Sequence, residues 1–277
     1  MQMGVQAGEP MMVDTILDVT GLTKSFGAIR ASDDLTFSVA RGEIHALIGP
    51  NGAGKSTAIG QLCGEIEPDQ GRIIFNDCDI SRWPTYRRAR SGLQRSYQIT
   101  SLFPDFSAAD NIALAVQAGR PHSFRFWQPA RHDKALRTPA NEALDRVGLG
   151  HKADTKVTAL SHGEQRQLEL AMVMATDPVM LLLDEPMAGM GQVESQLMME
   201  ILHPLKGDVS ILLVEHDMDV VFALADRISV LDKGRVLWTG PPDEVRNDPY
   251  VRRAYLVDSG YGVAGAQRCR NFLWHIA

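Results

Sequence analysis

One loop sets the expected architecture: Gly49-Pro50-Asn51-Gly52-Ala53-Gly54-Lys55-Ser56-Thr57. It matches the complete G-x-x-x-x-G-K-[ST] pattern of a phosphate-binding loop, between a short apolar strand at Ile44–Ile48 and a predicted helix at Ser56–Glu65. Glycines let backbone N–H groups turn inward around phosphate oxygens, and the positive end of the helix faces the same anion. We therefore predict a nucleotide site that includes Gly49, Asn51, Gly52, Gly54, Lys55, Ser56 and Thr57.

The chemistry of this loop indicates ATP and Mg²⁺ as cofactors. Lys55 is expected to reach the β and γ phosphates, and the hydroxyl of Ser56 is expected to bind Mg²⁺. Kinases, GTPases and many motor proteins carry the same loop, so it identifies the ligand but not the reaction.

Two further apolar runs follow along the chain. Val179–Leu183 and Ile211–Val214 are apolar throughout and are separated by helical patterns, which indicates a parallel sheet covered on both faces. Ligands bind at the carboxyl ends of the strands in such a sheet. The polar residues at those ends are Asp184, Glu185, Glu215 and His216.

The pattern changes between about residues 91 and 165, where helical periodicity such as that of Ala108–Val116 predominates. We predict an inserted helical subdomain there, and short strands at Ile16–Val19 and Leu35–Val39. The expected fold class is α/β: a P-loop NTPase core with a mostly parallel sheet, an antiparallel β subdomain and the inserted helical subdomain. Residues 15–258 are expected to form one ATPase domain, with residues 1–14 as a disordered leader and residues 259–277 as a tail of unknown role.

Composition narrows the class of partners. The 277 residues carry a formal net charge of −6, so nucleic acid is not expected as a partner. The three cysteines form no Cys-x-x-Cys pair and fit a reducing compartment. No apolar run reaches the roughly 18 to 20 residues that cross a bilayer, and Met1–Asp14 lacks the Lys or Arg of a secretory signal. A role at a membrane would therefore require docking on other chains.

The segment Leu160-Ser161-His162-Gly163-Glu164-Gln165 resembles the signature sequence of ATP-binding-cassette proteins, whose common form is Leu-Ser-Gly-Gly-Gln. It lies shortly before Val179–Pro186, which resembles the second nucleotide motif of that family and ends in an acidic pair. Three single residues match in the expected order: Phe26, Gln98 and His216. Family-like sequence extends over roughly Ile16–Leu256.

The resemblance implies a role for each matching residue. Phe26 would stack on adenine. Asp184 would hold Mg²⁺ together with Ser56 and Gln98, because hard oxygen ligands suit that ion. Gln98 would also link the nucleotide site to a transmembrane partner. The proposed catalytic groups, which orient water and stabilise the transferring phosphoryl group, are Glu185, His216, Lys55 and Gln98.

Ser161 and Gly163 open a predicted helix, whose N-terminus favours phosphate. In the family that phosphate belongs to ATP bound by the opposite subunit, so the resemblance implies a homodimer or heterodimer of ATPase subunits around two ATP molecules. His162 and Glu164 depart from the common signature, although Ser161 and Gly163 are retained. Pro186–Gly191 lacks an aspartate that is often found there, which affects the expected contact between subunits.

Finer resemblance points to the ATP-binding subunits of bacterial branched-chain (hydrophobic) amino-acid importers. It is carried by Arg95–Phe103, Leu160–Gln165, Pro186–Met190 and Leu213–Met218. The family implies transmembrane permease subunits, indirectly a periplasmic substrate-binding protein, and a peripheral position on the cytoplasmic face of the inner membrane.

Alternative functions remain open at this point. Closely related cassettes serve urea or short-amide import or drive export. A soluble cassette ATPase acting on nucleic acid or ribosomes is disfavoured by the net negative charge. It is also disfavoured because this chain carries one cassette, where such proteins usually carry two. A nucleotide sensor without turnover is disfavoured by Glu185 and His216. The apolar stretch Ile99–Pro104 fits either a docking surface or local packing.

Overall fold

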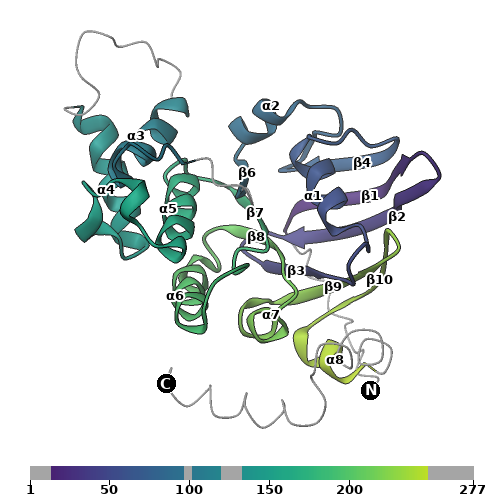
Figure 1. The fold of residues 1–277 in the computed structure, drawn as a ribbon. Coiled ribbons are helices and arrows are strands. Elements are labelled where there is room, and N and C mark those ends of the chain that lie inside the picture. The colour runs from purple at the N-terminus through teal and green to yellow at the C-terminus, as the bar shows by residue number, and fades with distance from the viewer. Residues whose placement is uncertain (1–13, 97–101, 120–132, 249–277) are drawn as a thin grey trace, which may run out of the picture.

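Two β-sheets lie on either side of a central helix in the computed structural model, which describes residues 14–96, 102–119 and 133–248 (Figure 1). The smaller sheet is antiparallel and has the strand order β2-β1-β4-β5. Its strands are β1 (Thr15–Phe26), β2 (Ile29–Ala40), β4 (Gln70–Phe75) and β5 (Cys78–Asp79).

The larger sheet has six strands in the order β10-β9-β3-β8-β7-β6. The pairing of β10 with β9 is antiparallel, and the other pairings are parallel. Every residue of β3, β7 and β8 is buried, as expected for strands that are covered on both faces. The strands are β3 (Ile44–Ile48), β6 (Leu93–Ser96), β7 (Met180–Asp184), β8 (Ser210–Val214), β9 (Arg227–Asp232) and β10 (Arg235–Gly240).

The helices cover the two faces of the larger sheet and form a lobe beside it (Figure 1). In chain order the α-helices are α1 (Lys55–Cys63), α2 (Thr85–Arg90), α3 (Ala108–Ala118), α4 (Lys134–Arg146), α5 (His162–Met174), α6 (Gln192–Leu202), α7 (Met218–Leu224) and α8 (Pro242–Asn247). Short 3₁₀ turns are η2 (Gly150–Lys152), η3 (Val157–Ala159) and η4 (His203–Leu205). Within the described ranges, no helix combines the length and apolar character needed to span a membrane.

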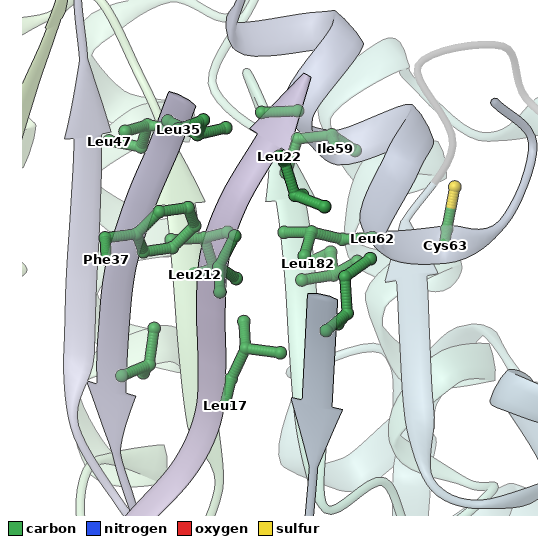
Figure 2. Packing of buried hydrophobic residues seen from close by; sticks show 14 of the residues in the cluster. Leu17, Leu22, Leu35, Phe37, Leu47, Ile59, Leu62, Cys63, Leu182 and Leu212 are labelled. Atoms are coloured by element: carbon green, nitrogen blue, oxygen red, sulfur yellow. The ribbon is translucent and has the colours of Figure 1, made fainter. Parts of the chain in front are cut away.

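Helix α1 packs between the two sheets (Figure 2). Ile59 and Leu62 on α1 belong to one buried cluster with Leu22 of the smaller sheet and with Leu182 and Leu212 of the larger sheet. All five side chains are fully buried. The same helix therefore joins both sheets, and its N-terminus is held at the end of β3.

The helical lobe has its own apolar cluster, built from α3, α4 and a face of α5 that includes Leu168 and Ala171. Ser107 caps α3, where its hydroxyl accepts a hydrogen bond from the backbone N–H of Asp110 at 3.1 Å. Leu170 and Met174 on the second half of α5 pack against the larger sheet, so this helix joins the lobe to the core.

The architecture confirms the predicted fold class, with one adjustment to the limits of the helical subdomain. We predicted it to begin near residue 91, but β6 pairs in parallel with β7, from Leu93 opposite Met180 to Ser96 opposite Leu183. The lobe therefore starts after β6. The predicted leader before residue 14, the predicted tail and Gln98 lie outside the described residues.

A Leu182→Ala substitution is expected to lower the free energy of unfolding by about 2–5 kcal/mol, because it leaves a cavity between α1 and the larger sheet. Leu237→Ala on β10 is the matched control. Its side chain is 45% exposed, and the same truncation should cost about 0.5 kcal/mol. Urea unfolding followed by circular dichroism measures both variants, and equal losses would contradict the packing described here.

Candidate functional site

The phosphate-binding loop connects the end of β3 at Ile48 to the start of α1 at Lys55. Gly54 caps the helix with a left-handed φ of 106°, and a Cβ atom there would lie 2.3 Å from the carbonyl oxygen of Ala31. The carbonyl oxygen of Ala53 accepts a hydrogen bond at 2.8 Å from the backbone N–H of Gly234, in the turn between β9 and β10. Backbone atoms of β2 and of the β9–β10 turn, one from each sheet, thus contact the outer side of the loop.

Lys55 lies inside the curve of this loop. Its side chain is 8% exposed, and its ammonium donates hydrogen bonds to the carbonyl oxygens of Gly49 and Pro50. Burial lowers the pKa of Lys55, and the nearby carboxylates of Glu185 and Asp184 oppose that shift. The lysine is thus within electrostatic reach of an acidic pair that is distant in sequence.

The acidic pair stands where β7 ends. Asp184 is buried, and burial raises the pKa of its carboxyl, against the opposing effect of the Arg95 guanidinium. Glu185 has a φ of +50°, and its backbone N–H donates to the carbonyl oxygen of Val214 on β8 at 2.8 Å. A left-handed conformation in a residue other than glycine costs about 1–3 kcal/mol and is concentrated at functional sites.

His216 lies beside this acidic pair. Its Nδ1 atom is 3.8 Å from Oε1 of Glu185, and its side chain is 64% exposed. The preceding Glu215 is 1% exposed and accepts hydrogen bonds from the backbone N–H groups of Met187 at 3.0 Å and His216 at 3.1 Å. Glu215 thereby ties the end of β8 to the segment that follows Glu185. The sequence places Glu215 at a strand end but does not predict this contact.

The signature segment opens α5. The Ser161 hydroxyl accepts from the N–H of Glu164 at 3.3 Å, and the Glu164 carboxylate accepts from the N–H of Ser161 at 2.9 Å, which forms a capping box. Lys152 pairs with the same carboxylate and holds its pKa below the ordinary value. Glu164, one of the two departures from the common signature, therefore stabilises the start of the helix.

His162 and Gly163 of the signature segment lie against the loop after Glu185 and the start of α6. A Cβ on Gly163 would lie 2.7 Å from the carboxylate of Glu194, and a Cβ on Gly189 would lie 3.4 Å from Nε2 of His162. Glu194 also accepts from the backbone N–H of Gly191 at 3.1 Å and caps α6. The sequence carries no motif that points to Glu194, and its contact with Gly163 exists only in the fold.

A cavity of about 540 Å³ lies beside these residues, lined by Ser161, Gly163, Glu164 and side chains of α4 and α6. Of the described residues that line it, none belongs to the phosphate-binding loop. Ser161 is exposed. The cavity beside the signature residues is therefore a different site from the nucleotide loop of the same chain.

The remaining predicted residues occupy the edges of the site. Phe26 is 50% exposed at the end of β1, with the ammonium of Lys24 5.7 Å from its ring centre. Asn51, Gly52 and Ser56 are exposed, and Thr57 is half-buried. Gln98 lies outside the described residues.

The residues present fit Mg²⁺ bound together with a nucleotide. The buried carboxylate of Asp184 and the exposed hydroxyl of Ser56 offer hard oxygen donors. In the described part of the chain, no group of three or more His, Cys, Asp or Glu side chains could hold a metal ion. Mg²⁺ commonly keeps water and phosphate oxygens as ligands, so a small set of protein donors suits it.

Together, the sheet, the loop and the inserted lobe define a P-loop nucleotide-binding protein. The family model "ABC transporter" matches residues 32–188, and the model "Branched-chain amino acid ATP-binding cassette transporter" matches residues 235–256. The chain belongs to the ABC transporter family and is an ATP-binding-cassette ATPase.

Curated relatives match over nearly the whole chain. The high-affinity branched-chain amino acid transport ATP-binding protein LivG of Escherichia coli is 36% identical over 257 residues, which cover 88% of this chain and 99% of the relative. The protein BraF of Pseudomonas aeruginosa, of the same description, is 35% identical over 87% of this chain and 97% of its own. The predicted resemblance is confirmed.

Solved structures of ATP-binding cassettes share the fold. A nucleotide-free cassette from an ABC transporter superposes with a TM-score of 0.76 at 27% identity, covering 87% of this chain and 98% of that one. A cassette crystallised in its ADP conformation gives a TM-score of 0.77 at the same identity and coverage.

Gly54→Ala is expected to destabilise the protein by about 3 kcal/mol or more, since the new methyl group would displace the Ala31 backbone as well as strain φ. Gly52→Ala is the matched control. Gly52 also has a positive φ, of 81°, but a Cβ there meets nothing within 4 Å, so the cost should be about 1–2 kcal/mol. Thermal unfolding of both variants measures the two losses of stability. A larger loss in Gly52→Ala than in Gly54→Ala would contradict the close approach of the Ala31 backbone to Gly54.

Proposed function

We propose that this chain binds and hydrolyses ATP to energise a membrane transporter that imports branched-chain or other hydrophobic amino acids. The observation that carries the proposal is the match of residues 235–256 to the branched-chain amino acid cassette family, together with 36% identity to LivG over 88% of the chain. The names of LivG and BraF state branched-chain amino acid transport for those relatives.

The nucleotide would bind across the loop and the start of α1. Backbone N–H groups from Gly52 to Ser56 and the helix N-terminus favour phosphate, and the Lys55 ammonium stands inside the same curve. The half-exposed ring of Phe26 would stack on the base. Ser56 and Asp184 would hold Mg²⁺, with Gln98 as a further proposed ligand. When bound, the ion would neutralise charge on the phosphates.

Glu185 is the proposed group that orients the attacking water and accepts its proton. Its left-handed backbone carries strain of the kind that is concentrated at functional sites, and this strain is the support for the assignment. His216, with Nδ1 3.8 Å from the Glu185 carboxylate, would donate a hydrogen bond toward the γ-phosphate. Lys55 would stabilise the charge that develops there.

A second ATPase subunit is proposed to complete the site. Exposed Ser161 and the N-terminus of α5 would meet the nucleotide of the partner subunit, since the cavity beside them is lined by no described residue of this chain's own loop. We further propose that residues 15–258 form one domain that docks peripherally on permease subunits at the cytoplasmic face of the inner membrane. A periplasmic substrate-binding protein would deliver the amino acid.

Glu185→Gln is expected to lower the rate of ATP hydrolysis at least about 100-fold, because the amide cannot accept the proton of the attacking water. ATP affinity should change less than about threefold, since the charge on the phosphates is met by other groups. Phosphate release and equilibrium binding measure the two effects.

Glu67→Gln, an exposed site beyond α1, is the control and should hydrolyse ATP like the wild type. A Glu185→Gln protein with an unchanged turnover number would remove the proton-acceptor role from Glu185.

The transport partners are tested by tagging the Glu185→Gln variant in its native cells and identifying the proteins that co-purify from gently solubilised membranes. We expect two multi-span permeases and a periplasmic binding protein for amino acids. A binding protein for urea or amides, an export permease or soluble partners alone would each contradict amino-acid import and leave the ATPase assignment intact.

A further inference from the structure

Arg95 is a largely buried cation at the edge of the nucleotide site, to which the sequence motifs assign no role. It lies on β6, opposite Leu182 of β7, and its side chain is 13% exposed. Its Nη2 atom is 2.9 Å from Oδ2 of Asp184, and its Nη1 atom is 2.5 Å from Oε2 of Glu65. A single guanidinium thus bonds two carboxylates.

These two carboxylates belong to different parts of the core. Glu65 follows the C-cap of α1, whose N-terminus carries the phosphate-binding loop, and Asp184 ends β7. Arginine presents donors in a rigid planar fork, so it can join two acceptors in a fixed geometry, whereas the lysine ammonium is a single point charge on a flexible stem. Arg95 therefore couples the far end of α1 to the proposed metal-binding carboxylate.

The Asp184 carboxylate depends on this contact for its orientation. Within the described ranges, the hydrogen bond to its oxygens comes from Arg95 and engages Oδ2, which leaves Oδ1 for a metal. The side chain is 6% exposed, so water cannot replace the guanidinium without rearrangement. A carboxylate that is held at one oxygen presents the other in a defined direction.

We propose that Arg95 is a positioning residue that orients Asp184 for Mg²⁺ and thereby sets the affinity of the site for the ion. This inference rests on the proposed function, in which Asp184 is a metal ligand. It goes beyond that function by assigning metal affinity to a residue that touches neither the nucleotide loop nor the reacting atoms. Orientation of the carboxylate is proposed to outweigh the repulsion between the guanidinium and the cation.

The test is a titration of Mg²⁺ against binding of a fluorescent methylanthraniloyl-ATP, with thermal unfolding recorded for every variant. Arg95→Gln should require about 10-fold more Mg²⁺ for half-maximal binding, the scale typical of residues that orient a metal ligand. Arg95→Lys keeps the charge and one bond, and should shift the requirement by about threefold. Affinity for the analogue in EDTA should stay within about twofold of the wild type.

Glu65→Gln is the matched control, because it removes the negative charge at the outer partner of Arg95 and leaves the bond to Asp184. It should lower the midpoint of thermal unfolding without a change in Mg²⁺ dependence. Arg95→Gln that binds Mg²⁺ as tightly as the wild type, or more tightly, would overturn the inference. If Arg95→Gln does not fold, Arg95→Lys with wild-type Mg²⁺ dependence would overturn it equally.

The wild-type protein separates this inference from the function on which it rests. Nucleotide binding that does not respond to Mg²⁺ in the wild type would contradict the metal site itself. If the wild type responds to Mg²⁺ and all Arg95 variants show the same Mg²⁺ dependence, the proposed role of Arg95 is contradicted and the metal site is not.

Discussion

The packing of α1 between the two sheets is the constraint on which the nucleotide site depends. Ile59 and Leu62 fix the helix against apolar side chains of both sheets, and this burial holds its N-terminus where β3 ends. The loop between strand and helix then has little freedom, since Ala31 and Gly234 contact it from outside. Phosphate recognition by backbone N–H groups requires such a preformed curve, because a flexible loop would lose conformational entropy on binding.

Charge is concentrated where β7 and β8 end. Asp184, Glu185 and Glu215 stand close together, and burial alone would favour the protonated forms of Asp184 and Glu215. The fold opposes this effect in part, with Arg95 at Asp184 and with two backbone N–H groups at Glu215. The acidic cluster is therefore formed before any ligand binds. The positive φ of Glu185 shows that this arrangement carries backbone strain.

The departures from the common family pattern meet in space. His162 lies against Gly189, and the carboxylate of Glu194 covers Gly163, so the signature helix and the segment after Glu185 contact each other within one chain. Glu164 closes a capping box that a glutamine can also form. The altered signature thus keeps an ordered helix N-terminus, the feature on which recognition of a phosphate depends.

The sequence by itself determined the loop at residues 49–57, the buried parallel strands and the candidate residues Lys55, Asp184, Glu185 and His216, because each belongs to a local pattern or ends an apolar run. Only the tertiary structure decided the contacts of Arg95 and Glu194. Their partners are 89 and 31 residues away, and no local spacing encodes a contact that packing alone creates. The short, half-polar strand β6 likewise became part of the core only through its pairing with β7, since a four-residue run of mixed polarity has no distinctive period.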